Sequence, residues 1–583
     1  MKKVIRLFIV FNLIILNACD DGFLEVSPQG ALVGAESLAT MEGIDALLIG
    51  AYSVLDGWNG IGEGAWRSPA SNWTYGNVPS DDGYKGSDQG DQTPLNDIER
   101  FTAIASNPYF LTKWKVVYDG VRRSNDVLRA ITTARKIGTI DESDIETVNI
   151  REAEARFLRG HYHFEAKKMW NNVPYVDEIP LKIDEFKITN TVDIWPSIEE
   201  NFQFAIDHLP ETQPEIGRIA SWTAKGLLAK AHMFQQDFVA AKILLDDIMN
   251  NGPFDLLPNY GDNFNVTFNN SVEDVFEVQT SVNDGVTNSG NGNWGDVINF
   301  PHDGSPFGCC GFNQPSFNLV NAYQTDPATG LPLLDTFNDD ILTNDQGIDS
   351  TEPFTEYQGT LDPRLDHTVG RRGIPYLDWG DHGGRLWIRD QGFSGPYSPK
   401  KNVYRKSDVG NLTSNSGWTT NANAINIPLI RFADVILWRA EVAVEESDFE
   451  TARQLVNRIR ARARDGAFVS ESDGSPAANY LINEYPTGHP AFGSLTEARK
   501  AVRFERRLEL GMEGHRFFDL VRYRIAAETL NTYFAIEGTR NGRIFLAGAN
   551  FEPGKHEYFP IPLSEILASS SNGVSSLTQN PGY

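Results

Sequence analysis

The chain is poor in cysteine, has no long apolar run beyond its first residues, and carries no surplus of positive charge. Three cysteines in 583 residues are too few for a disulfide framework or for a structural zinc site with four ligands. No later stretch reaches the ~18 consecutive apolar residues of a membrane helix. The formal net charge of −27 disfavours nucleic acid and acidic membranes as partners, although a local patch can differ from the total.

Signatures of catalysis are missing as well. The sequence contains no HExxH, GxSxG or GxxxxGK motif. Four acidic residues, Asp81, Asp82, Asp88 and Asp91, form a loop that could bind Ca²⁺ through oxygen ligands, but their spacing does not follow the EF-hand order. A solvated acidic loop is the favoured interpretation. We therefore expect no cofactor, with calcium as the one metal left open.

Two of the cysteines are adjacent in the sequence. Cys309 and Cys310 stand between Gly308 and Gly311. They form either a vicinal disulfide that stiffens this turn or a pair of buried thiols.

The first residues read as an export signal. Cations at positions 2, 3 and 6 precede an apolar run at 7–16, and Ala18 stands just before Cys19. This order predicts a secretory signal over residues 1–18. The segment around Cys19 resembles a bacterial lipoprotein box, whose thiol takes a diacylglycerol, and acyl chains contribute ~0.8 kcal/mol per buried CH₂ to membrane anchoring. The alternative is a cleaved signal with an incidental cysteine.

Helical periodicity marks four regions of the body. Apolar residues recur three or four apart over Tyr109–Thr132 and over Asn149–Trp170. Two further regions repeat one pattern, in which an alanine-rich amphipathic helix is followed by an Asp-Phe pair and a second helix. The first helices are Ser221–Gln235 and Phe432–Glu445, and Asp237 and Asp448 are expected N-caps. Helix pairs that recur in this way resemble tetratricopeptide repeats.

Two long segments have a different character. Residues 252–428 and 57–98 are rich in Gly, Asn, Asp and Pro, and within the first only short runs such as Val275–Val278 and Asn426–Ile430 suggest strands. A structureless loop of such length is implausible in a compact domain, so we expect an irregular lobe packed against the helices. Binding residues concentrate on loops held by a rigid scaffold, which makes these segments the place to search for a site.

Several sequence blocks, in a fixed order, carry a family resemblance. The blocks are Cys19-Asp-Asp-Gly-Phe-Leu-Glu25, Trp114-x3-Tyr118 with Asn125, Glu154-Ala-Arg-Phe-Leu-Arg-Gly160 with Val173-Pro174, Ile427-Pro-Leu-Ile-Arg-Phe-Ala-Asp-Val435 with Arg439-Ala-Glu441, Glu505-Arg-Arg-Leu-Glu-Leu510, Glu513-Gly-His-Arg-Phe-Phe-Asp-Leu520, Pro560-Ile-Pro562 and Gln579-Asn-Pro-Gly-Tyr583. Together they resemble the SusD/RagB family of outer-membrane nutrient-binding lipoproteins of Bacteroidetes.

The resemblance implies a mainly α fold, with four tetratricopeptide-like helix pairs forming a superhelical scaffold and a large loop-rich insertion lobe containing few short strands. It implies a single body over 19–583, with the scaffold at about 36–250 and 427–583 and the lobe at about 251–426. In the family this body is lipid-anchored on the cell surface. It lies over a SusC-like TonB-dependent outer-membrane transporter, captures an oligosaccharide, less often a peptide, and performs no catalysis.

Sugar chemistry then selects candidate ligand-binding residues. A pyranose has an apolar face that aromatic rings cover and a rim of hydroxyls that polar side chains satisfy. The candidates are aromatic and polar residues of the loop segments: first Trp73, Trp294 and Trp379, then Trp66, Tyr75, Trp387, Phe307, Asn72, Asp296 and Arg372. Further loop candidates are Trp58, Phe312, Tyr376, Tyr397, Trp418, Asn293, Asp378 and Arg389. For each aromatic the competing interpretation is local loop packing, but exposed aromatic surface usually serves binding.

A charged segment near the C-terminus also admits an enzymatic interpretation. Glu505, Glu509, Glu513 and Asp519 could include the carboxylate pair of a glycoside hydrolase. The arginines at 506, 507 and 516 stand at positions suited to ion pairing, so we predict instead a partly buried ion-pair network that locks the last helices. The sequence leaves two further functions open, those of a peptide-binding protein and of a purely structural lid.

Overall fold

The computed structural model describes every residue except 1–34, 59–61, 180–186, 303 and 416–420. Cys19, the predicted signal and Trp418 therefore lie outside the described residues. The helices are α2 (Met41–Tyr52), α3 (Glu63–Arg67), α4 (Thr93–Glu99), α5 (Pro108–Ile137), α6 (Ile145–Trp170), α7 (Trp195–His208), α8 (Ser221–Gln235), α9 (Phe238–Asn251), α10 (Phe317–Ala322), α11 (Arg364–Thr368), α12 (Gln391–Ser394), α13 (Phe432–Glu445), α14 (Phe449–Asp465), α15 (Leu495–Leu510), α16 (Arg516–Arg522), α17 (Ala526–Thr539) and α18 (Leu563–Ala568).

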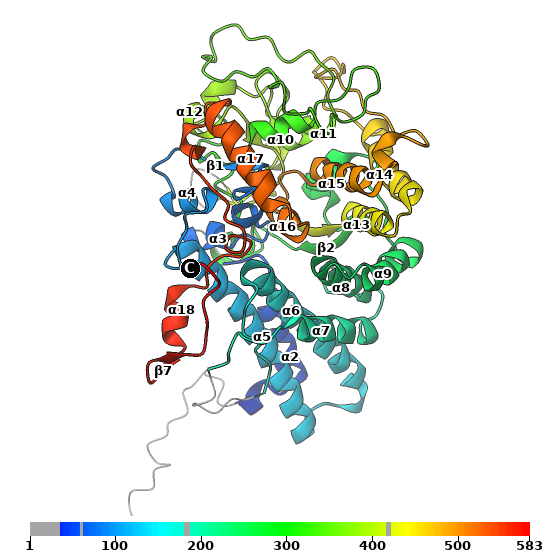
Figure 1. The fold of residues 1–583 in the computed structure, drawn as a ribbon. Coiled ribbons are helices and arrows are strands. Elements are labelled where there is room, and N and C mark those ends of the chain that lie inside the picture. The colour runs from blue at the N-terminus through cyan, green and yellow to red at the C-terminus, as the bar shows by residue number, and fades with distance from the viewer. Residues whose placement is uncertain (1–34, 59–61, 180–186, 303, 416–420) are drawn as a thin grey trace, which may run out of the picture.

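The long helices form a curved frame. Each of α5 to α9 packs against the next, α9 packs against α13, and α13 packs against α14 and α15. α9 and α13 are therefore neighbours although the whole loop-rich segment separates them in the sequence (Figure 1). The chain is mainly helical, as predicted. No helix among the described residues is long and apolar enough to cross a membrane.

The repeated helix pairs have the predicted boundaries. α8 and α13 begin and end at the predicted residues. The side chains of Asp237 and Asp448 cap α9 and α14 by accepting hydrogen bonds from the backbone N–H groups of Ala240 and Thr451, both at 3.1 Å. These bonds satisfy helix N-terminal donors that have no partner within the helix. The assignment of the pairs to tetratricopeptide repeats stays a prediction.

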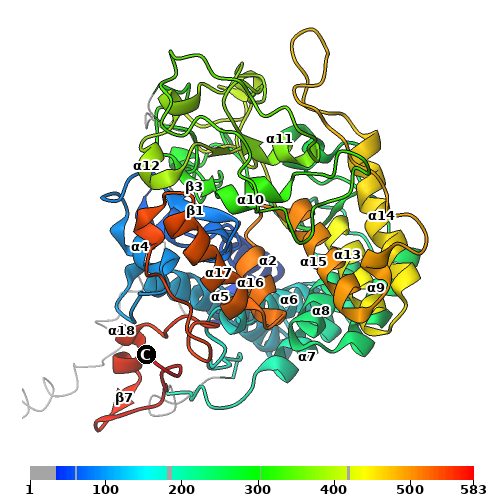
Figure 2. The same cartoon turned by 45° about the horizontal axis from the view of Figure 1, so that its top comes forward.

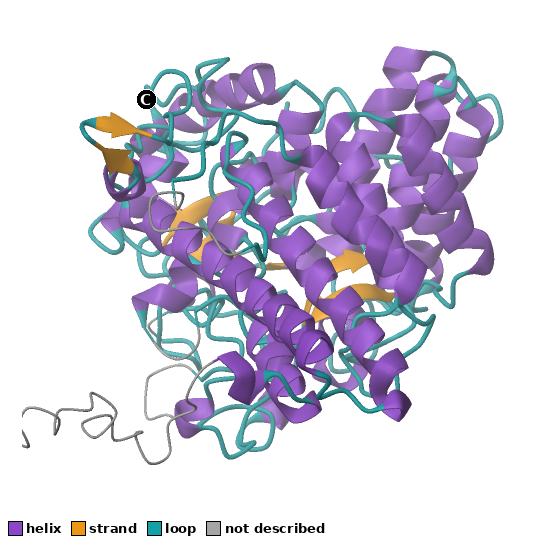
Figure 3. Cartoon of the chain, turned by 90° about the horizontal axis from the view of Figure 1, so that it is seen from below, coloured by secondary structure: helices purple, strands orange, loops and turns teal. Residues whose placement is uncertain are grey.

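The strands are short and pair only two by two among the described residues. They are β1 (Gly83–Gly86), β2 (Asp274–Val278), β3 (Phe312–Pro315), β4 (Val369–Gly370), β5 (Ser398–Pro399), β6 (Ile427–Arg431), β7 (Ser570–Ser571) and β8 (Val574–Ser575). Both predicted strands exist, and they pair with each other as β2 and β6. This ribbon lies where the loop-rich segment leaves the helical frame and returns to it. Figure 3 shows the few strands in orange among the helices.

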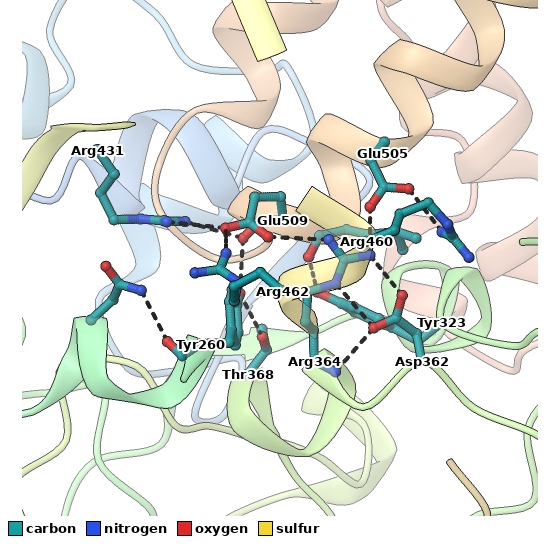
Figure 4. Close-up of polar contacts among 12 residues, drawn as sticks. Tyr260, Tyr323, Asp362, Arg364, Thr368, Arg431, Arg460, Arg462, Glu505 and Glu509 are labelled. Carbon is teal, nitrogen blue, oxygen red and sulfur yellow. Dashed lines mark hydrogen bonds and ion pairs between the residues drawn. The ribbon is translucent and has the colours of Figure 1, made fainter. Parts of the chain in front are cut away.

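A buried ion-pair network joins the loop-rich lobe to the frame. Arg364 of α11 bonds Glu505 at 2.7 Å and Glu509 at 3.1 Å, both on α15 (Figure 4). Arg431 at the end of β6 bonds Glu509 at 3.0 Å, and Arg460 of α14 bonds Glu505 at 2.9 Å. The predicted network exists, but these two glutamates pair with arginines of other segments and not with those of their own helix. Neighbouring positions on one helix cannot reveal such partners.

Candidate functional site

The two loop segments that the sequence singled out meet in the structure. β1 of the first segment pairs antiparallel with β3 of the second, and the Ser87 N–H donates to the Gly311 carbonyl at 2.5 Å. The vicinal pair Cys309–Cys310, which directly precedes Gly311, is a disulfide. Of the two states open from the sequence, the bridged one is therefore the one present.

A groove with a cavity volume of about 530 Å³ lies on the loop-rich lobe. Its walls are residues 346–351 and residues 385–392, and the second wall runs into α12, which is labelled at the upper left of Figure 1. The lining is mainly polar, with amide, hydroxyl and carboxyl groups from Gln346, Ser350 and Asp390. Leu386 adds an apolar side chain that is 54% exposed. We call this feature the lobe groove.

Arginines fix the two walls of the lobe groove. Arg389 bonds Asp88 at 2.8 Å and Asp91 at 2.6 Å, which ties one wall to the loop that follows β1. Arg372 donates to the backbone carbonyls of Asp349 at 3.1 Å and Ser350 at 2.8 Å, which fixes the other wall. These bonds form without a ligand, so the groove is preformed.

An aromatic cluster supports the lobe beneath its surface. The Phe307 ring lies 4.9 Å from the Trp379 ring and 5.3 Å from the Tyr404 ring, and Tyr376 lies 5.5 Å from Trp387. The Trp387 carbonyl accepts a hydrogen bond from the backbone of residue 302, and the Leu386 carbonyl accepts one from Gly304. The cluster thus anchors the backbone on which Leu386 stands.

A second group of predicted residues forms a buried polar junction. Asp296 accepts hydrogen bonds from the Ser71 hydroxyl at 2.7 Å and from the Asn293 amide at 2.9 Å. Burial raises the pKa of Asp296, although these bonds act in the opposite direction. The Trp73 indole N–H donates to the Gly295 carbonyl at 2.9 Å. This junction holds the segments around residues 72 and 295 against each other.

The predicted site residues are therefore mostly interior. Trp66, Asn72, Trp73, Tyr75, Trp294, Asp296, Phe307 and Trp387 are buried, whereas Trp379 and Arg372 are partly exposed. The indole of Trp294 donates to the Ser289 carbonyl and the hydroxyl of Tyr75 donates to the Arg67 carbonyl, as in a packed core. A buried ring offers no free face to a sugar in this conformation. A ligand contact for these residues stays a prediction.

Sequence reasoning named Arg372 and Arg389 but missed Leu386 and the 346–351 loop. The run of Asn, Asp, Gln, Gly and Ser at 344–350 marks a surface loop. Nothing in the sequence shows that this loop faces Leu386, because the two segments come together through contacts between distant positions. The Ser350 hydroxyl accepts a hydrogen bond from the Leu386 N–H at 2.9 Å, and the Gln391 side chain accepts one from the Gly347 N–H at 3.0 Å.

The acidic loop considered for calcium is neutralised by cations. Asp81 bonds Arg516 at 2.7 Å and Asp82 bonds Arg507 at 2.7 Å, all in buried positions or nearly so, and Asp88 and Asp91 bond Arg389. Within the described residues no three His, Cys, Asp or Glu side chains are grouped to hold a metal ion. The arginines take the place that calcium would need to occupy.

Two family models match the chain. One, described as the SusD family, matches residues 272–583, and the other, described as starch-binding and associating with the outer membrane, matches residues 22–233. Because the first alone covers more than half of the sequence, this protein belongs to the SusD family.

Known relatives are distant but span nearly the whole chain. A SusD-like protein of Bacteroides ovatus is 24% identical over 91% of this chain and 84% of its own length. SusD-like protein P25 of Formosa agariphila is 24% identical over 100% of this chain and 99% of its own.

Solved structures confirm the fold. A laminarin-binding SusD-like protein superposes with a TM-score of 0.64 at 23% identity, covering 93% of this chain and 100% of its own. Surface glycan-binding protein A from Bacteroides thetaiotaomicron, in complex with laminarihexaose, gives 0.62 at 21% identity, covering 93% and 99%.

Proposed function

We propose that this protein is a cell-surface lipoprotein that captures an oligosaccharide in the lobe groove and delivers it to a partner TonB-dependent outer-membrane transporter. The anchor is Cys19, and the protein itself performs no catalysis. The lobe groove carries the proposal. It is a preformed hollow of about 530 Å³ on loops that a rigid frame supports, within the usual size range of a small-ligand site.

The chemistry of the lobe groove suits a sugar. Leu386 offers an apolar surface for the C–H face of a ring. The Gln346 amide and the Asp390 carboxylate each keep an oxygen for sugar hydroxyl groups beyond their bonds to Gln391 and Phe393, whereas the Ser350 hydroxyl is already bonded to Gly383 and Leu386. The lining contains two arginines, Arg385 and Arg389, and two aspartates, Asp349 and Asp390, so it has no surplus of positive charge that would favour an acidic ligand. We therefore propose a neutral glycan, and laminarin is the first candidate because one similar structure is a laminarin-binding SusD-like protein and another is in complex with laminarihexaose.

The carboxylates that could suggest hydrolysis are committed to structure. Glu505 and Glu509 are fully buried and each bonds at least two arginines. The Arg462, Arg431 and Arg364 guanidiniums hold the pKa of Glu509 far below its usual range, although burial acts in the opposite direction. A general acid needs a raised pKa and access to the glycosidic oxygen, and Glu509 has neither. Binding without cleavage is therefore the favoured activity.

The test is a binding screen with the full chain in mild detergent. Laminarin, other neutral glucans, acidic glycans and mixed peptides are compared by calorimetry, with a reducing-end assay run in parallel. We expect one neutral glycan to bind and no reducing ends to appear. Leu386→Ala should weaken that binding about fivefold, because losing the half-exposed leucine contact removes ~1 kcal/mol.

Leu567→Ala is the matched control, since Leu567 is also exposed but stands on α18. It should bind the glycan like the unaltered protein. Equal affinities for both variants would place the ligand outside the lobe groove. Binding of peptides alone, or release of reducing ends, would reject the glycan-capture function itself.

A further inference from the structure

Two small hollows adjoin one another on the helical frame, far along the chain from the lobe groove. One is lined by parts of α9, α13, α15 and α16 and has a volume of about 200 Å³. The other is lined by parts of α6, α7, α8 and α16 and has a volume of about 150 Å³. Gln236, Arg522 and Arg524 line both. We call them together the basic pocket; the helices that form it lie side by side in Figure 2.

The charge of this lining is opposite to that of the whole protein. Six cationic side chains line the two hollows: Lys167, Lys168, Arg499, Arg503, Arg522 and Arg524. Only two carboxylates, Glu441 and Glu445, line them as well. Lys167 and Lys168 pair with Asp193 at 2.8 Å and Glu165 at 2.6 Å, just outside the lining, so any attraction for anions rests on the arginines.

Two of the arginines are not neutralised. Arg522 bonds Glu441 at 2.6 Å and Arg499 bonds Glu445 at 2.7 Å. Arg503 and Arg524, by contrast, have no carboxylate within 4.0 Å among the described residues. The Arg503 guanidinium lies over the ring of Tyr523, 4.2 Å from its centroid. Stacking holds Arg503 in place while leaving its N–H donors uncommitted.

The backbone at the shared wall is formed by two helix ends. Gln236 and Arg524 both have φ near +60°, in the left-handed region where glycine is the usual residue after a helix. α8 ends at Gln235 and α16 ends at Arg522, so both positions follow helix ends. This conformation is common where a helix ends, so it sets the course of the chain at the wall. The Gln236 amide donates to the Arg522 carbonyl at 2.6 Å, which fixes the wall between the hollows.

The second hollow also contains aromatic side chains. Trp195 and Tyr558 line it, both only partly buried, and the Lys167 amine lies 5.8 Å from the Trp195 ring. Aromatic surface beside cationic groups suits a ring that carries a negative charge. Each hollow is smaller than the ~300 Å³ at which drug-sized sites begin, which favours a single sugar unit over a folded segment.

We propose that the basic pocket is a second saccharide site, which binds the carboxylate or sulfate group of an acidic sugar through Arg503 and Arg524. It is separate from the lobe groove and does not depend on the glycan bound there. A uronic acid and a sulfated sugar share this anionic chemistry. The experiment therefore tests one uronic acid and one sulfated sugar.

The experiment titrates the full chain in mild detergent with D-glucuronate, glucose 6-sulfate and glucose, followed by ligand-observed NMR. We expect at least one of the anionic sugars to bind and glucose not to bind at this site. Arg503→Ala should weaken binding about tenfold, as should Arg524→Gly. Arg464→Ala, which removes a partly exposed arginine from α14, should leave it unchanged. Raising the salt to 0.5 M should weaken it, since the attraction is screened.

Arg524→Gly separates a binding role from a structural one. Glycine relieves the left-handed backbone, so this variant should melt no lower than the unaltered protein and yet lose affinity. Any one of three results overturns the proposal. They are glucose binding as tightly as the acidic sugars, an unchanged affinity for the acidic sugars in both arginine variants, and an oligoglutamate peptide that binds more tightly than either acidic sugar.

Discussion

We call the buried ion-pair network around Glu505 and Glu509 the α15 junction. This junction and the lobe groove use the same residue types for opposite purposes. At the junction, Arg364 and Glu509 are fully buried and every charge meets an opposite one. At the groove, Arg389 is about one-third exposed and pairs with carboxylates that are equally open to water. Buried pairs make removal of one partner costly, whereas exposed pairs contribute little to stability. Burial, more than residue type, therefore separates the structural charges from those at a surface open to ligand.

The largest expected effect follows from breaking the junction. Arg364→Ala leaves Asp362, Glu505 and Glu509 with one cation fewer in a site closed to water. We expect the free energy of unfolding to fall by about 5 kcal/mol, the upper end for a broken buried pair. Urea denaturation measures this change.

Arg389→Ala is the counterpart at the lobe groove. It removes an arginine with two carboxylate partners, but the site is partly exposed, so the loss should stay below about 1 kcal/mol. Similar losses for the two variants would mean that burial does not distinguish the two regions.

A buried tryptophan gives the next largest effect. Trp73 is 1% exposed, its ring packs near Phe312, and its indole bonds the Gly295 carbonyl. Trp73→Ala should lower the free energy of unfolding by about 4 kcal/mol, because it leaves a cavity. Glycan affinity measured well below the melting temperature decides the role of the residue. Unchanged affinity is expected of a packing residue, and a loss as large as that of Leu386→Ala would restore Trp73 to the ligand site.

Helix boundaries could be predicted from the sequence because their signals are local. Asp237 and Asp448 mark helix starts, and the apolar spacing that follows them needs no distant partner. α7 has a similar apolar stripe, with Ile198, Phe202 and Ala205 buried. Its local pattern would have supported the same kind of prediction.

The candidate site could not be predicted in the same way. Trp73 and Leu386 both stand in loop segments, yet one is buried and the other is half exposed. What separates them is packing between segments more than 200 residues apart, such as the Trp73 bond to Gly295. Residue type alone pointed to the tryptophans, which are large enough to form the core of an irregular lobe.

An effect smaller than those of Arg364→Ala and Trp73→Ala concerns pH and the ribbon between lobe and frame. Glu277 on β2 accepts a hydrogen bond from the Asn426 amide at 2.7 Å, and among the described residues no arginine or lysine pairs with it as Arg364 pairs with Glu509. Burial, with help from nearby Asp274, raises the pKa of Glu277 to about 7. The folded state therefore holds a proton that the unfolded chain releases at lower pH, so stability falls as pH rises from about 5 to 8. Because the side chain is partly exposed, we expect the change to be about 1–2 kcal/mol.

Denaturation at a series of pH values measures this change in stability, with Glu277→Gln as the control. The control should flatten the profile over this window, and an unchanged slope would assign the pH dependence to other groups.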